Sequence, residues 1–423
     1  MTYYRVVTQG TDPEVAIFDK DNNIVPAGTV FRKAIDVIRE RNLERETNRP
    51  VPFRMESVNL GGKSYVIKET ELIVGNRNIP LPIFKATGYP SGSVQIDGIA
   101  VEFTTNPASC RNHIIQDIAG KFRAVKEIVK LANKNWRVGI LPAVSLTPEQ
   151  LQALPKEAQI FGCSPDLDIY GEAEKCLAVV DASTNPIRSF GGHMHASFAG
   201  GGLELLGDDY GKKSMVDWFS ENSTKITITL DRIIGITSVA MTGGELETRR
   251  RSIYGQAGRV RVQDYGGIEY RTPSNFWLMH PVVANYMMLL MQVALNVSVL
   301  EDLRNQIWEL AKITEIVDVI NNSRTDRAME LVEATMELIM RTPELSRSLN
   351  DSAMRTYRMA GKRVPTYYNQ QDEMIEIPRY FYERGGVANI VDPFEAINNW
   401  TQVKDPEYGE LGNTFDFRKE FEN

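Results

Sequence analysis

Short apolar runs separated by glycine, proline and asparagine fill the first two thirds of the chain, a pattern typical of antiparallel or mixed sheets. Apolar residues at helical spacing predict helices over residues 114–132 and 225–241, between the runs. The runs predict strands at residues 14–18, 64–68, 99–103, 138–141, 167–170, 193–198 and 268–271.

The pattern changes after residue 275. Residues 281–310 are rich in leucine, methionine, valine and alanine at helical spacing, and a second helical pattern covers 326–340. From residue 365 the chain is aromatic and polar with little periodicity. We therefore expect an α+β domain over residues 1–364, mainly helical from 275 to 364. Residues 365–423 are expected to form an extension that wraps the surface or mediates assembly.

Several predicted strands carry an isolated reactive side chain opposite their apolar residues. Because side chains alternate across a strand, residues i and i+2 share a face. His193, His195 and Ser197 therefore share one face of their strand, and Glu269 and Arg271 share one face of another. Two earlier strands each isolate a glutamate in the same way, Glu14 and Glu102.

If these faces converge, they form a site that binds metal and phosphate. Carboxylates with one imidazole suit Mg²⁺ or Mn²⁺ better than zinc, and the expected ligands are Glu14, Glu102, Glu269 and His193. Arginine forks match phosphate oxygens, which Mg²⁺ also binds. The arginines lie in one short stretch: Arg249, Arg250, Arg251, Arg259, Arg261 and Arg271. Together these residues predict a site for a polyphosphate nucleotide and its metal ions.

Each of these motifs also has a purely structural interpretation. An isolated glutamate on a strand often faces solvent, and two histidines on one strand can be a hydrogen-bonded pair. The arginine run after Glu247 can be the exposed end of a helix, where basic side chains favour the dipole. Asp166 and Asp168 share one face of a short strand and suit either a metal or amine contact or a turn cap.

Composition places the chain among mildly acidic globular proteins. It has 423 residues with 48 basic and 55 acidic side chains, a net charge of −7, and 42% hydrophobic residues. This excludes disorder of the whole chain and argues against non-specific nucleic-acid binding. The longest apolar stretch, 286–300, is interrupted by asparagine and glutamine, and the start lacks a signal-peptide pattern, so no membrane segment or secretion is expected.

Motif searches exclude several common site types. The three cysteines, Cys110, Cys163 and Cys176, show no CxxC spacing, so we expect no disulfide framework or zinc site and a reducing cytoplasm. No Walker A loop, dinucleotide-binding glycine motif, GxSxG elbow or Cys-His arrangement is present. The carboxylate, histidine and arginine motifs therefore carry the functional prediction.

Six blocks of sequence resemble a known family, the phage-type carboxylate-amine ligases (amidoligases), which are related to glutamine synthetase and glutamate-cysteine ligase. They keep the family's order from Gly10 to Trp277. The blocks are GTDPE at 10–14, DGIAVEFTTNPA at 97–108, FGCSPDLDIY at 161–170, GGHMHASF at 191–198, RRRSIYGQAGRVR at 249–261 and GIEYRTPSNFW at 267–277.

The resemblance implies a fold and residue roles. The fold is a glutamine synthetase-like, mostly antiparallel curved sheet with flanking helices. His193 and Glu269 are expected to bind the metal beside the phosphates, and Glu14 and Glu102 the other metal. His195 is expected to point toward phosphate. Arg271 is expected to contact the phosphoryl group, with Arg250 and Arg251 preferred over Arg249 among the three consecutive arginines as catalytic residues. Nucleotide contacts are expected from Arg249, Arg259, Arg261, Arg271 and Ser197.

The implied reaction is ATP-dependent amide formation through an acyl phosphate, with Mg²⁺ or Mn²⁺ and with small-molecule or peptide carboxylates and amines as substrates. The resemblance allows a homo-oligomer and, for a phage-encoded protein, the host cytoplasm. Residues 365–423 and the ammonia-site acid of the synthetase have no counterpart that we recognise, so the amine donor stays open. The alternatives are a non-catalytic phage protein on the same scaffold and a metal-dependent hydrolase using His193 and His195. The hydrolase is disfavoured because only His113 and His280 remain as further imidazoles.

Overall fold

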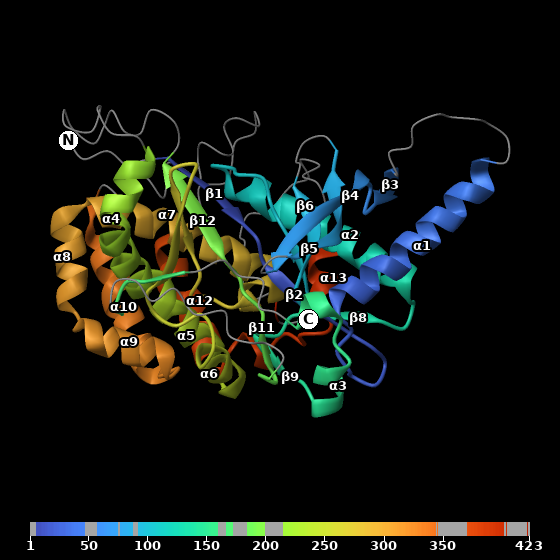
Figure 1. The fold of residues 1–423 in the computed structure, drawn as a ribbon. Helices are drawn as coiled ribbons and strands as arrows, with labels where there is room; N and C mark the ends of the chain where they lie inside the picture. The colour runs from blue at the N-terminus through green and yellow to red at the C-terminus, as the bar shows by residue number, and fades with distance from the viewer. Residues whose placement is uncertain are drawn as a thin grey trace.

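The structure is a computed structural model with an α+β fold, in which antiparallel sheets are covered by helices (Figure 1). It describes residues 6–46, 57–74, 77–87, 92–159, 166–171, 184–198, 215–343, 345, 370–401, 403 and 421. The mixture of helix and antiparallel sheet confirms the predicted α+β class, and the glutamine synthetase-like form of the sheet stays a prediction.

The first sheet places the predicted histidine and glutamate strands side by side. Within the described residues it has five strands in the order β1-β12-β14-β13-β10, all antiparallel. One of its faces is apolar and is covered by helices α4 (Met215–Leu230) and α7 (Pro281–Val299). The strands are β1 (Val7–Thr11), β12 (Met194–Phe198), β14 (Gly267–Tyr270), β13 (Arg259–Gln263) and β10 (Leu167–Asp168).

The second sheet carries the two glutamate strands. In the described part of the chain it has seven strands in the order β3-β4-β5-β6-β7-β2-β8. Helices α1 (Ala27–Glu46) and α2 (Arg111–Ala132) pack together and against it. The strands are β3 (Ser57–Leu60), β4 (Lys63–Val74), β5 (Arg77–Ala86), β6 (Ser93–Asp97), β7 (Ala100–Phe103), β2 (Glu14–Phe18) and β8 (Arg137–Gly139).

The two sheets meet where β1 leads into β2. β1 ends at Thr11 and β2 begins at Glu14, so only two residues separate them, and Figure 1 shows both blue strands near the middle of the molecule. The Thr11 hydroxyl donates to the His193 carbonyl oxygen at 2.6 Å. The Gly191 N–H donates to the Glu14 carboxylate at 2.7 Å. These bonds bring the glutamate of the second sheet beside the histidine strand of the first.

Helices form the other half of the molecule, on the left of Figure 1. α7 is apolar on all sides and long enough to cross a membrane. However, 83% of its most apolar 18-residue stretch is buried inside the protein, as in a core helix. The segment from α4 to α5 is one helical run. The remaining elements here are the π-helical η4 (Asp231–Gly235), α5 (Ile236–Thr242), α6 (Glu245–Arg251), η5 (Asn275–Met279), α8 (Glu301–Glu309), α9 (Ile313–Asn321) and α10 (Thr325–Arg341).

Short elements complete the fold, including two helices in the aromatic C-terminal segment. α12 and α13 pack buried side chains, among them Phe381 and Trp400, against the rest of the protein. The assembly role of residues 365–423 stays a prediction. The elements are α3 (Pro148–Gln152), η1 (Lys156–Ala158), the paired strands β9 (Ala143–Ser145) and β11 (Ile187–Ser189), α12 (Gln370–Tyr382), η6 (Val387–Asn389) and α13 (Ala396–Thr401).

All seven predicted strands are present, with end points shifted by a few residues. β4 is longer than its apolar pattern suggested, and the described residues hold seven further strands that were not predicted: β1, β3, β5, β6, β9, β11 and β13. β13 reads as RVRVQ, in which arginines occupy one face and valines the other. The arginines that the sequence suggests as nucleotide contacts therefore lie on one face of a strand.

Candidate functional site

One face of the five-stranded sheet is polar from strand to strand. His195 on β12 lies opposite Glu269 on β14, which lies opposite Arg261 on β13. Residues opposite each other in an antiparallel pair share a face, so these three side chains form a row across the sheet. Their neighbours Met194 and Ile268 are buried on the other face. The predicted alternation of polar and apolar faces is therefore confirmed.

The second sheet contributes three carboxylates at the same junction. Glu14 on β2 lies directly opposite Glu102 on β7, and both are buried. Asp97 ends β6, and it offers an oxygen within 4.8 Å of ligand oxygens of both glutamates. Gln95 donates a hydrogen bond to the Glu102 carboxylate. Three acidic oxygens so close together form a group that could hold a cation.

Asp12, in the two-residue link between the sheets, forms a second such group with His195 and Glu269. Ligand atoms of the three residues lie within 4.8 Å of one another. The Asp12 Oδ1 atom is 3.0 Å from His195 Nε2 and 3.6 Å from His193 Nδ1. His193 Nδ1 is also 3.6 Å from Glu269 Oε1. The link therefore joins the carboxylates of one sheet to the histidines of the other.

Burial and mutual repulsion perturb these carboxylates. Burial, and then the charge of Asp97, raise the pKa of Glu14 to about 8. Burial, and then the charge of Asp12, raise the pKa of Glu269 to about 7. The pKa of Glu102 is raised well above its ordinary value by burial and by Asp12. Bringing a divalent cation between these groups would remove the repulsion, so the site is electrostatically suited to one.

The two histidines differ in their protonation. Burial, and then the nearby Arg271 guanidinium, lower the pKa of His193 to about 3, so its ring is neutral. Burial also lowers the pKa of His195, but the Asp12 carboxylate outweighs burial and leaves the pKa raised. His195 Nδ1 lies 3.1 Å from the Tyr265 hydroxyl. Both rings face the acidic groups, and the expected contact of His195 with phosphate stays a prediction.

Arginines border the acidic groups on the β13 and β14 side. Arg271 Nε is 2.9 Å from Asp166 Oδ1, and its guanidinium also donates to Glu269 and to the Tyr254 hydroxyl. Arg261 Nη1 donates to Glu269 at 3.0 Å. The sheet face thus runs from carboxylates at one end to guanidiniums at the other.

Asp166 and Asp168 prove to be partners of these arginines. Arg261 Nη2 is 3.4 Å from Asp166, and Arg259 Nη2 is 3.3 Å from Asp168. The other Asp168 oxygen accepts the Tyr170 N–H at 3.1 Å, which is the turn-capping role that the sequence allowed. Residues 161–165 of the same block lie outside the described residues.

The three consecutive arginines diverge. Arg249 is half exposed and pairs with Glu245 at 2.6 Å, away from the acidic groups. Arg250 is fully buried and donates to the Thr272 carbonyl at 2.7 Å, which leaves it as a support of the loop after β14. Arg251 bonds Ser323 Oγ at 2.7 Å and lies 3.3 Å from Glu247. The structure therefore brings neither Arg249 nor Arg251 to the acidic groups.

Ser197 also has a local partner. Its hydroxyl donates to the Gly266 carbonyl oxygen at 2.5 Å, at the turn between β13 and β14. This bond ties β12 to the neighbouring hairpin. The expected nucleotide contact of Ser197 stays a prediction.

Several residues around the site were missed in the sequence. Asp12 stands in GTDPE, but a residue between strands has no alternation to single it out. Asp97 precedes a glycine and looks like an ordinary turn residue. Tyr254 lies 3.3 Å from His193 Nε2 and also contacts Arg271, yet a lone tyrosine after an arginine run carries no signal. Gln263, which donates to Glu269, lies beyond the arginines on β13.

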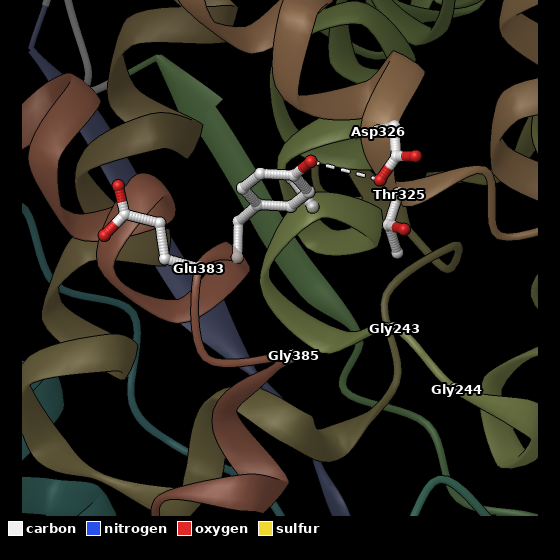
Figure 2. Close-up of a pocket in the computed structure, with 8 residues that line it drawn as sticks. Gly243, Gly244, Thr325, Asp326, Glu383 and Gly385 are labelled. Carbon is white, nitrogen blue, oxygen red and sulfur yellow. Dashed lines mark hydrogen bonds between the residues drawn. The ribbon is translucent and has the colours of Figure 1, made fainter.

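A separate pocket lies among the helices (Figure 2). The ends of α5 and α12 and the start of α10 line it, and the Tyr382 hydroxyl donates to Asp326 at 3.1 Å. None of the residues that line this pocket belongs to the acidic groups or to the arginines beside them. The candidate site is therefore the polar sheet face and not this pocket.

Comparison with known families supports a ligase. The model of the family described as phage phiEco32-like COOH-NH2 ligase, type 2, matches residues 219–376. This confirms the resemblance to phage carboxylate-amine ligases over a stretch that holds the arginines, Glu269 and Arg271. The match covers less than half of the chain and does not include the blocks with Glu14, Glu102 and the two histidines. No curated protein matches the sequence.

Proposed function

We propose that the protein is an ATP-dependent carboxylate-amine ligase built on a glutamine synthetase-like scaffold. The observation that carries this proposal is the junction of the two sheets, where two acidic groups lie close together and Glu269 of one of them pairs with Arg261 and Arg271. The matched family bears the name of this ligase activity. The resemblance to the amidoligases implies ATP dependence and an acyl-phosphate intermediate, and the closeness of carboxylates and guanidiniums is consistent with both.

The metal ligands that we propose differ in part from those expected from sequence. One ion, Mg²⁺ or Mn²⁺, is assigned to Glu14, Asp97 and Glu102, and a second to Asp12, His195 and Glu269. His193 lies beside the second group. Asp12 Oδ1 lies 3.0 Å from His195 Nε2 and 3.6 Å from His193 Nδ1, so a carboxylate oxygen and two imidazole nitrogens lie close together where a cation would bind. Bound divalent cations would offset the negative charge of the polyphosphate oxygens.

The arginines are assigned to the transferring phosphoryl group. In the proposed reaction a carboxylate oxygen of the acid attacks the γ-phosphorus of ATP, and the bond to ADP breaks. The amine then attacks the acyl carbon, phosphate leaves and the nitrogen loses a proton. Arg271 and Arg261, held by Asp166 and Glu269, have fixed positions before substrate arrives. Preorganised charges of this kind are the main source of catalysis in phosphoryl transfer.

Hydroxylamine provides the direct test. The full-length protein with Mg²⁺, ATP, hydroxylamine and a panel of amino acids or peptides should release ADP and phosphate and form a hydroxamate. Release of AMP and pyrophosphate would contradict the acyl phosphate and indicate adenylate chemistry. A protein that binds neither metal nor ATP would instead favour the non-catalytic scaffold, which is our alternative.

The hydrolase alternative loses support from the positions of the remaining histidines. His280 Nδ1 caps α7 by accepting the Val282 N–H at 3.2 Å, and burial lowers its pKa to about 4. His113 lies on α2, outside the acidic groups. Each proposed metal group then has one imidazole at most, which favours Mg²⁺ or Mn²⁺.

We further propose small-molecule or peptide carboxylates and amines as the substrates, and no nucleic-acid or membrane partner. A cytoplasmic location, in the host if a phage encodes the protein, and a homo-oligomeric state complete the proposal.

Cys110 is a free thiol in the structure, while Cys163 and Cys176 lie outside the described residues.

A further inference from the structure

A buried carboxylate lies on the other side of the five-stranded sheet from the candidate site. Asp231 is fully buried and begins η4, where the helix widens between α4 and α5. The Ile236 N–H donates to the Asp231 carbonyl five residues earlier, which is the bonding pattern of a π-helix. Such widened turns are uncommon in helices and often accompany functional sites.

Two partners of the Asp231 carboxylate lie in the hairpin of β13 and β14 or directly before it. Oδ1 accepts the Tyr270 hydroxyl at 2.6 Å, and Oδ2 accepts the Gly258 N–H at 2.8 Å. Tyr270 lies between Glu269 and Arg271 in the chain. Gly258 directly precedes Arg259 at the start of β13. The bond to Tyr270 therefore holds the strand position between Glu269 and Arg271, and the bond to Gly258 holds the position next to Arg259. These neighbouring residues lie on the face of the candidate site.

Two glycines make these approaches possible. A Cβ atom at Gly235 would lie 2.7 Å from the Tyr270 hydroxyl oxygen, so a larger residue would push the phenol away. Gly258 has a φ of +81°, in the left-handed region that favours glycine, and a Cβ there would lie 2.6 Å from the Tyr170 ring. The helix and the hairpin are thus shaped around this carboxylate.

We propose that Asp231 is a positioning residue for the candidate site. Through Tyr270 and Gly258 it fixes the hairpin against the helix and thereby sets where Glu269 and Arg271 lie on the opposite face. A shift of a strand moves the residues on both of its faces together. Displacements near 1 Å are enough to disturb a reacting geometry. The effect on turnover rests on the proposed function, whereas the positional effect does not.

The test compares two tyrosine variants that each lose one buried hydroxyl. Tyr270→Phe removes the bond to Asp231 and keeps the ring. Tyr286→Phe is the matched control, because the Tyr286 hydroxyl is also buried and donates to the Met374 carbonyl at 2.9 Å, between α7 and α12. Asp231→Asn adds a change at the carboxylate itself.

The readout is histidine NMR of the full-length protein. The chain has four histidines, so each ring can be followed separately. His193 Nδ1 lies 3.6 Å from Glu269, and His195 lies opposite Glu269 on the neighbouring strand. We expect Tyr270→Phe and Asp231→Asn to shift the ring resonances of His193 and His195 and to leave His113 and His280 in place. Tyr286→Phe should leave His193 and His195 unchanged. Unshifted resonances in the folded Tyr270→Phe protein would overturn the proposal, as would equal shifts in the control.

Turnover gives a second, separable readout. If the wild-type protein is a ligase, Tyr270→Phe should lower kcat by about tenfold or more while KM for ATP changes much less, because the reacting geometry is disturbed. The double variant that combines Tyr270→Phe with Asp231→Asn should be no slower than Asp231→Asn alone, since both substitutions break the same hydrogen bond between Tyr270 and Asp231. An inactive wild-type protein would refute the proposed function, and the NMR comparison would still decide on Asp231.

Discussion

Glu269 is the residue on which the two halves of the site meet. It lies within reach of a histidine on one side and of two arginines on the other. Burial raises its pKa, and the neighbouring cations lower it. The same carboxylate can therefore serve a metal ion and hold the arginines that face the phosphates.

Removal of one of these charges should abolish turnover. We expect Glu269→Gln, and separately Arg271→Ala, to lower kcat by on the order of 10² or more, because preorganised charge on the transferring phosphoryl group is lost. The measurement is ADP release at saturating ATP, with circular dichroism to show that the variants fold. Arg249→Ala is the control, since Arg249 contacts Glu245 and the Ser145 hydroxyl, away from the acidic groups, and should keep wild-type turnover. If kcat fell equally in Glu269→Gln, Arg271→Ala and Arg249→Ala, the assignment of Arg271 to the phosphoryl group would be wrong.

The consecutive arginines illustrate where residue-level prediction ends. Successive residues on a helix point about 100° apart, so Arg249, Arg250 and Arg251 face three directions. One meets solvent, one meets the backbone after β14, and one meets Glu247. The sequence shows that three arginines are consecutive, but the orientation of the helix decides which of them faces solvent, the backbone after β14 or Glu247.

At the scale of elements, the C-terminal helix α13 belongs to the core. The Trp400 ring stacks on Phe122 of α2 with centroids 5.3 Å apart, and its Nε1–H donates to the Leu278 carbonyl. Trp400 is fully buried. Sequence periodicity missed this helix because α13 is only six residues long, too short to show a helical repeat.

Trp400→Ala should therefore destabilise the whole protein. We expect a loss of about 3–5 kcal/mol in the free energy of unfolding, as for other large buried aromatic residues. Arg379→Ala on α12 is the control, because its ion pair with Glu333 is exposed and should contribute less than about 1 kcal/mol. Urea unfolding followed by tryptophan fluorescence measures both. A stability change in Trp400→Ala as small as in the control would show that residues 365–423 are a peripheral extension.

At the scale of the molecule, the acidic groups make stability depend on pH and on metal. The pKa values of Glu14 and Glu269 are raised to about 8 and about 7, so the folded state binds more protons than the unfolded state above pH 5. Their contribution to stability is thus lost as the pH rises toward 8. The lowered pKa of His193 acts in the opposite direction only below about pH 6.5, where the unfolded state takes up its proton.

The metal-free protein should accordingly lose thermal stability between pH 6.5 and 8. Mg²⁺ or Mn²⁺ should restore it, with a rise in Tm that grows with pH, because cations compete with protons for the same oxygens. Differential scanning calorimetry with EDTA and with added metal measures this. Glu102→Gln should reduce both the pH slope and the metal effect. A metal-independent Tm across this range would contradict the proposed ion sites.

Sequence reasoning recovered much of the candidate site because strand alternation is a local property. Glu14, Glu102, His193, His195 and Glu269 were each predicted from the polar face of a single strand. The residues that it missed, Asp12 and Asp97, lie in a link and at a strand end, where no periodic pattern operates. Their importance arises from which strands pair.

The sequence by itself determined which side chains share a face of each predicted strand and where the strongly periodic helices lie, since both depend on neighbours a few residues apart. Only the tertiary structure decided that the two-residue link between β1 and β2 brings two sheets together, so that Asp12 lies between acids and histidines. Strands distant in the chain pair through backbone bonds that any residue can make, and their partners are chosen by packing of the whole core.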